Sequence, residues 1–210
     1  MMDLSRFLGR YSVDANLEAP VVAPMRQTGG RPPGTMPGEV AELLETIGGM
    51  SFSGGLYRLH RLEDIASWNE TLATAWSDTR ERVTCFAYDW LGRQFALFEK
   101  AMILQFSAGV LEWVEIPADI KTFHNEILLD LAEPALAVNF YNAWLESGGK
   151  PPRYSECVGY KRPLFLGGDD WVENLEVIDM DVYWTVTAPM IAKARRVGVG
   201  GLIGKIEIGE

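Results

Sequence analysis

The residues best suited to chemistry or binding lie near the C-terminal end of the chain, in a stretch that is both acidic and aromatic. Between Pro163 and Ala192 there is no Lys or Arg. Aliphatic and aromatic side chains alternate there with six carboxylates: Asp169, Asp170, Glu173, Glu176, Asp179 and Asp181. Acidic runs on folded proteins are most often solvated faces. The interleaved aromatics favour a more specific interpretation, a folded acidic surface that meets a basic partner.

A turn is predicted within this stretch, because Gly167-Gly168 precedes Asp169-Asp170 and paired glycines favour tight turns. Trp171 follows directly. An exposed aromatic beside charge is typical of an interface anchor, whereas the same indole folded inward would belong to the core, and the sequence leaves both alternatives open. We predict contacts with a protein partner at Asp169, Asp170, Trp171, Glu173, Glu176, Asp179 and Asp181.

The other reactive residue types do not form a pattern that indicates catalysis or a cofactor. Cys157 has no neighbouring base, and His60 and His124 have no Cys, Asp or second His at ligand spacing. Asp179 and Asp181 with Glu176 lack the further oxygen ligands and turn glycine of a calcium loop. The glycine run 198–204 has Ile203 in the place of the third glycine of a dinucleotide loop. We therefore predict no metal, no cofactor and no catalytic residue.

Composition limits the classes of partner. The chain has 210 residues and a formal net charge of −10, which fits one domain with tails and argues against direct binding of nucleic acid. A basic, nucleic-acid-binding protein would be attracted instead. Two cysteines and no long apolar run predict a reduced, cytoplasmic protein that has neither a signal peptide nor a membrane span.

The pattern of residues divides the chain into three parts. Residues 1–35 are rich in Pro and Gly, which predicts a linker or an arm laid over the domain. Residues 36–192 form the predicted domain, and 193–210 a Gly-rich tail. Apolar periodicity predicts helices over 37–47, 63–76, 117–131 and 134–145, and one that begins near Asp179 or Asp181. Strands are expected over 56–59, 83–88, 93–98, 102–106, 110–116, 158–167 and 174–178.

This order of elements lacks regular alternation of strand and helix. It favours an α+β fold in which helices flank a mostly antiparallel sheet.

Several segments, in order along the chain, resemble one known group of proteins. They are Pro37 to His60, Cys85 to Leu97, Ile116-Pro117, Phe123 to Glu126, Cys157 to Lys161, Leu164 to Gly168, Glu173 to Glu176 and Asp181 to Trp184. Together they are similar to GAD-like and SMI1/KNR4-like proteins, and to the C-terminal domain of type VI secretion immunity proteins that protect bacteria from DNase effectors. Phe98 departs from the pattern, and residues 1–35 and those after Ala192 carry none of it.

The resemblance implies an SMI1/KNR4-like α+β domain that binds and blocks a secreted toxin and is not an enzyme. A nuclease toxin with a basic surface fits the acidic stretch. Two alternatives stay open: a regulatory or scaffolding module of the SMI1/KNR4-like kind, and an enzyme that uses its carboxylates in a deep polar pocket. An effector gene beside this one would favour immunity over a regulatory module. A flat or convex acidic surface would exclude the enzyme.

Overall fold

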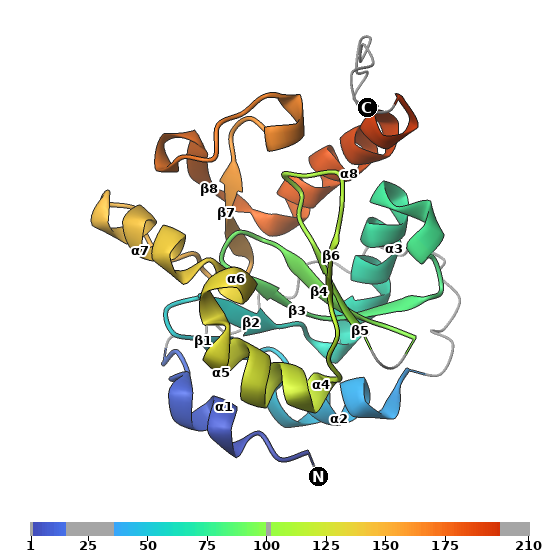
Figure 1. Cartoon of the computed structure of the whole chain (residues 1–210), viewed down its shortest axis with the longest axis vertical. Helices are drawn as coiled ribbons and strands as arrows, with labels where there is room; N and C mark the ends of the chain where they lie inside the picture. Colours follow the sequence, from blue (N-terminus) through green and yellow to red (C-terminus); the bar gives the residue numbers. More distant parts are fainter. Residues whose placement is uncertain (1, 16–35, 100–101, 198–210) are drawn as a thin grey trace.

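The main body of the protein is a six-stranded antiparallel sheet whose strands follow one another in chain order (Figure 1). The computed structural model describes residues 2–15, 36–99 and 102–197. The strands are β1 (Ser51–Phe52), β2 (Tyr57–Leu59), β3 (Val83–Asp89), β4 (Gln94–Phe98), β5 (Met102–Phe106) and β6 (Val114–Ile116). The hairpins predicted around the turns at 89–92 and 107–109 are present. The second one is shorter than predicted, because β6 begins at Val114.

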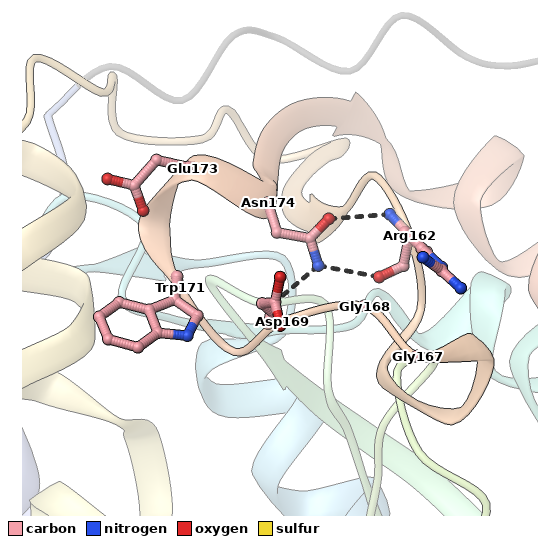
Figure 2. Close-up of a pocket in the computed structure, with 7 residues that line it drawn as sticks. All are labelled: Arg162, Gly167, Gly168, Asp169, Trp171, Glu173 and Asn174. Atoms are coloured by element: carbon pink, nitrogen blue, oxygen red, sulfur yellow. Dashed lines mark hydrogen bonds between the residues drawn. The ribbon is translucent and has the colours of Figure 1, made fainter.

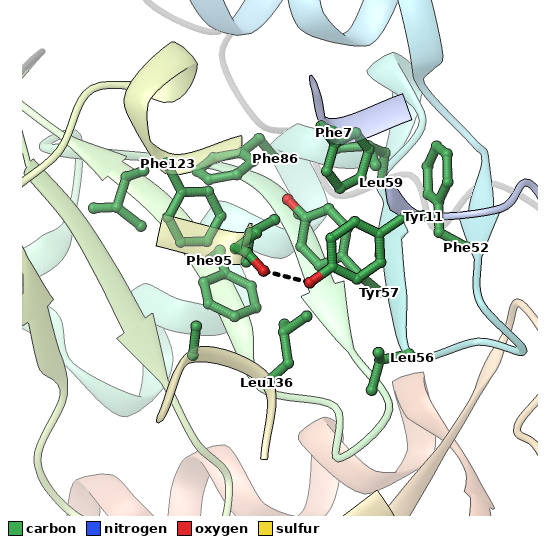
Figure 3. Packing of buried hydrophobic residues seen from close by; sticks show 14 of the residues in the cluster. Phe7, Tyr11, Phe52, Leu56, Tyr57, Leu59, Phe86, Phe95, Phe123 and Leu136 are labelled. Atoms are coloured by element: carbon green, nitrogen blue, oxygen red, sulfur yellow. Dashed lines mark hydrogen bonds between the residues drawn. The ribbon is translucent and has the colours of Figure 1, made fainter. Parts of the chain in front are cut away.

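Helices cover both faces of this sheet, so its central strands are buried on both sides. In β4, Phe95 and Leu97 pack into one apolar cluster, and Ala96 between them packs into the other. The first cluster lies under α2 (Gly38–Ile47) and the helical run α4 (Ile120–Thr122), η3 (Phe123–Ile127) and α5 (Leu128–Asp130) (Figure 3). The second lies under α3 (Ile65–Ala75) and α8 (Met180–Val197). The predicted α+β fold is confirmed.

Two predicted helices are less regular than their apolar stripes suggested. The segment predicted as one helix over 117–131 contains a π-helical turn, η3, between α4 and α5. The helix predicted to open at Pro134 is divided into α6 (Ala132–Leu136) and α7 (Val138–Glu146). Ala137 separates them, with a left-handed φ of 50°. Apolar spacing does not register such a break, because Ala137 still faces the core cluster.

The described part of the N-terminal segment, residues 2–15, is more ordered than its composition predicted. Residues Ser5–Arg10 form α1, and the Phe7 ring is fully buried in the first cluster. The Asn125 side chain accepts from the Phe7 N–H (3.2 Å) and donates to the Asp3 carbonyl (2.7 Å). The Tyr11 hydroxyl donates to the Leu128 carbonyl. The described part of the predicted arm therefore lies over the domain and supplies part of its core.

A segment just after α1 also protects one edge of the sheet. Val13 pairs with Phe52 of β1. The N–H of Asp14 donates to the Ser51 carbonyl at 2.9 Å. The Asp14 carboxylate also accepts from the N–H groups of Gly54 and Gly55, which hold the β1–β2 turn. The first edge of the sheet is therefore covered by residues of the same chain.

The acidic stretch belongs to a separate hairpin of β7 (Glu156–Tyr160) and β8 (Leu175–Asp179). The hairpin is fixed to the turn between β3 and β4: the Val158 N–H donates to the Trp90 carbonyl at 2.7 Å, and the Trp184 indole to the Gly92 carbonyl at 2.9 Å. The backbones approach closely, since a Cβ at Gly92 would lie 2.9 Å from the Cys157 sulfur.

A buried cation fixes the start of the hairpin. The Arg58 guanidinium donates to the carbonyls of Arg153 and Glu156 (2.6 and 2.5 Å) and to that of Asp89 (2.8 Å). It also lies over the Tyr88 ring. The division into arm, domain and tail stays a prediction. The boundary predicted at residue 192 falls inside α8, which continues to Val197, and residues 198–210 lie outside the described chain.

Candidate partner-binding surface

One amide side chain bonds three backbone groups in the connection between β7 and β8, residues 161–174. The connection includes the short helices η4 (Leu164–Leu166) and η5 (Val172–Asn174). The Asn174 side chain donates to the carbonyls of Arg162 (2.9 Å) and Asp169 (2.8 Å) and accepts from the Arg162 N–H (3.0 Å) (Figure 2). All three bonds go to backbone groups, so the Asn174 amide supplies hydrogen bonds that strand pairing would supply elsewhere.

Other contacts fix the same loop at its two ends and at its tip. The Lys161 ammonium donates to the Glu173 carbonyl (2.8 Å), and the Arg162 Nε to the Leu166 carbonyl (2.7 Å). Gly168 passes so close to Arg162 that a Cβ there would lie 1.9 Å from the Arg162 carbonyl oxygen. The glycine pair therefore makes the predicted turn. Glycine is required at position 168 because a larger residue would collide with the Arg162 backbone. The loop is a fixed platform for the side chains it carries.

Trp171 stands on this platform with its ring in solvent. Its residue is 68% exposed, the highest value among the large hydrophobic residues of the described chain. The core alternative for this indole is therefore excluded. Beside the ring is a shallow, open hollow of about 480 Å³. It is lined by Arg162, Gly167, Gly168, Asp169, Trp171, Glu173 and Asn174 (Figure 2).

The carboxylates near the ring differ in what they contact. Within the described chain, the carboxylates of Asp169 and Glu173 make no hydrogen bond or ion pair, so both are available to a cation. Asp170 is exposed but anchored, because its Oδ1 accepts from the Tyr160 hydroxyl at 2.6 Å. Burial, followed by this bond to Asp170, raises the pKa of Tyr160. The bond to Tyr160 therefore holds the Asp170 carboxylate in a fixed position at the surface.

The remaining predicted contact residues lie beyond the hollow, on β8 and the start of α8. Glu176 is exposed on β8 opposite Gly159. Asp179 accepts the Val182 N–H at 3.0 Å and so caps α8, which confirms the helix start predicted there. Asp181 is exposed in the first turn of α8. All seven predicted residues thus lie on consecutive parts of one hairpin and helix start, but only Asp169, Trp171 and Glu173 line the hollow.

Two residues that shape this surface were not predicted from the sequence. Arg162 lies just before the basic-free stretch and is one of the residues that line the hollow. Asn174 carries no charge, so a count of carboxylates passes over it. A signal was present in the position of Asn174, the first residue of the strand predicted over 174–178, because an amide next to a turn commonly satisfies its backbone.

The histidines and the cysteine considered for catalysis are buried within the packed core. The His60 ring is buried between Trp68 and Tyr88 and lies 2.7 Å from the Gln94 amide oxygen; burial lowers its pKa to about 3. The buried His124 ring lies 3.0 Å from the Tyr57 hydroxyl, and burial lowers its pKa to about 4. Burial raises the pKa of the Cys157 thiol. Among the described residues, no three His, Cys, Asp or Glu side chains gather to hold a metal.

Comparison with known families places the acidic hairpin in a defined context. Residues 125–190 match the family model described as T6SS immunity protein Tdi1, C-terminal. The predicted resemblance to type VI secretion immunity proteins is thereby confirmed over this part of the chain, which contains the whole of β7, β8 and the loop between them. The match supports a type VI secretion immunity-type protein.

The fold is shared with a solved structure. The crystal structure of Atu4351 from Agrobacterium tumefaciens superposes with a TM-score of 0.59 and 17% sequence identity, over 89% of each chain. At this identity the likeness concerns the fold alone. No curated protein matches the chain. Within residues 2–15, 36–99 and 102–197, no helix has the length and apolar character needed to cross a bilayer.

Proposed function

We propose that this protein binds and neutralises a cognate type VI secretion effector, and that the effector is a nuclease whose basic surface is covered by the β7–β8 loop. The observation that carries the proposal is Trp171, a tryptophan exposed on a rigid loop between two unpaired carboxylates. Large aromatics in this setting are the commonest anchors of protein interfaces. The family match, which spans this loop, supplies the class of partner.

Electrostatics explain why an acidic surface suits such a partner. A nuclease must present Lys and Arg to the phosphates of its substrate. A rigid acidic platform is attracted to the same groups, accelerates association and keeps the substrate away from them. The action is steric and electrostatic occlusion, and it requires no catalytic residue, cofactor or metal on the immunity protein.

An immunity protein of this kind is expected to have its effector gene beside its own, and the experiment uses the product of such a gene as the effector. In Asp169→Lys/Glu173→Lys both free carboxylates of the hollow are reversed, while Asp170 keeps its bond to Tyr160. Loss of electrostatic steering should lower the association rate about tenfold or more at low salt and make it less sensitive to salt. Stopped-flow association at several salt concentrations measures this. Protection of a bacterial host that expresses the effector should weaken in parallel.

A control with the same change of net charge separates local from global effects. Glu126→Lys/Asp130→Lys reverses two exposed carboxylates on η3 and α5, which lie far from the β7–β8 loop (Figure 1). This variant should associate within about threefold of the unmodified protein, since only distant charge has changed. Equal slowing by both pairs would refute the assignment of the surface. Failure of the unmodified protein to bind or neutralise the effector would refute the function.

A further inference from the structure

The second strand of the hairpin, β8, has one edge to which no strand of the described chain is paired. Its inner edge pairs with β7 along Glu156–Tyr160. β7 in turn is bonded on its far side to the β3–β4 turn through Val158 and Trp90. The hairpin thus continues outward from the body of the protein and ends at β8.

The direction of each peptide group along β8 follows from the pairing. The Val158 N–H donates to Trp90, away from β8, so its partner Val177 belongs to a pair that makes no ladder bonds. The Lys161 N–H donates to the Asn174 carbonyl, and the Met180 N–H to the Ser155 carbonyl. Because bonded and non-bonded pairs alternate in an antiparallel ladder, positions 174, 176, 178 and 180 face β7. The N–H groups of Val177 and Asp179 point outward.

This outer edge is accessible at the end where the strand meets α8. Leu175 is 2% exposed, whereas Val177 is 38% exposed and Asp179 is also exposed. Within the described chain, no hydrogen bond is made by the Val177 N–H. An open strand edge with unpaired N–H and C=O groups is a template for the addition of another strand. The first edge of the main sheet, by contrast, is covered by Val13 and Asp14.

The charges around this edge select the strand that could be added. Glu176, Asp179 and Asp181 are exposed along it, and Asp169 and Glu173 lie on the loop that leads into it. A second copy of the chain would bring like charges together, which opposes pairing of β8 with itself. An extended segment rich in Lys or Arg would find opposite charges along its whole length.

We propose that the outer edge of β8, at Val177 and Asp179, pairs with an extended basic segment of the effector. The proposal rests on the proposed function, and it adds how the partner is held. Strand addition gives a rigid, directional contact through backbone bonds, and the exposed acidic side chains then read the charge of the added strand. The outer edge of β8 is close to Trp171 in the sequence, because β8 directly follows the loop that carries the hollow.

Hydrogen exchange of single amides tests this pairing without any substitution. In the free protein the outward Val177 amide should exchange quickly, whereas the Ile178 amide, bonded to β7, should be protected. In the complex with the effector used to test the proposed function, exchange at Val177 should slow by at least about tenfold. Exchange at Ile178 should change little, so it serves as the internal reference.

A proline substitution tests the same bond by affinity. Val177→Pro removes only an outward N–H, a position at which an edge strand tolerates proline, and should weaken effector binding by about tenfold because a buried partner carbonyl is left without a donor. Val177→Ala keeps the N–H and should bind within about threefold. If the effector binds tightly and Val177 is neither protected nor sensitive to proline, strand addition is overturned while the proposed function stands. If the effector does not bind at all, both are overturned.

Discussion

Trp171→Ala removes the most exposed large side chain of the proposed interface and leaves the loop backbone unchanged. The Trp171 residue is 68% exposed. A tryptophan side chain offers up to about 200 Å² of surface, so a partner has roughly 130 Å² left to cover. At about 25 cal/mol per Å² this contact contributes roughly 3 kcal/mol to binding. The dissociation constant of the effector complex should therefore rise by about 100-fold.

Calorimetric titration with the effector measures this change in the dissociation constant. Urea unfolding measures the free energy of unfolding of the variant and so shows whether the fold is intact. The free energy of unfolding should stay within about 0.5 kcal/mol, because the indole contacts little in the free protein. Leu131→Ala is the matched control: Leu131 is 50% exposed at the far end of α5, and its truncation should leave binding unchanged. A Trp171→Ala complex as tight as that of the control would refute the reasoning from exposure to anchor.

Two further predictions concern the stability of the domain. The pKa values of His60 and His124 are lowered to about 3 and about 4, so the folded state keeps both rings neutral while the unfolded chain takes up protons below about pH 6.5. Protonation of the unfolded chain should therefore lower the free energy of unfolding at pH 5, relative to pH 7, by roughly 2 kcal/mol per ring, which urea unfolding measures. The His124→Gln variant should lose about half of this pH dependence. An unchanged pH dependence in this variant would contradict the burial argument. Asp179→Ala should lower the free energy of unfolding by about 1 kcal/mol through loss of the α8 cap. Asp179→Asn, which keeps a capping oxygen, should restore most of it, and equal destabilisation by both would show that charge matters more than the cap.

The parts of the fold that were predictable are those set by local spacing. Val40, Leu43, Leu44 and Ile47 are buried on α2, as their helical period requires. The turn at 89–92 and its flanking strands were equally clear from their sequence. The α1 helix was not, because only Phe7 of its six residues is buried. A single buried side chain produces no periodicity, and its contacts with Asn125 and His124 are far away in the sequence.

The candidate site, like the fold, has parts that local sequence could predict and parts that depend on distant contacts. Charge and composition were enough to locate Asp169, Trp171 and Glu173, which do share one hollow. They could not show that Asp170 is bonded to Tyr160, since that contact depends on how β7 and the loop fold back on each other. Nor could they reveal the open edge of β8. Which way the Val177 N–H points is decided by the bond between Val158 and Trp90, and Trp90 lies on another part of the chain.

The docking of α1 has a consequence for synthesis of the chain. The Phe7 N–H and the Asn125 side chain that receives it are separated by 118 residues. At about 5–20 residues per second, a ribosome needs roughly 6–24 s to make that interval. For this time the Phe7 ring has no completed groove to fill, because His124 and Asn125, which contact Phe7, are not yet part of the nascent polypeptide. The packing of α1 is therefore a late event in synthesis, completed only after more than half of the chain has been made.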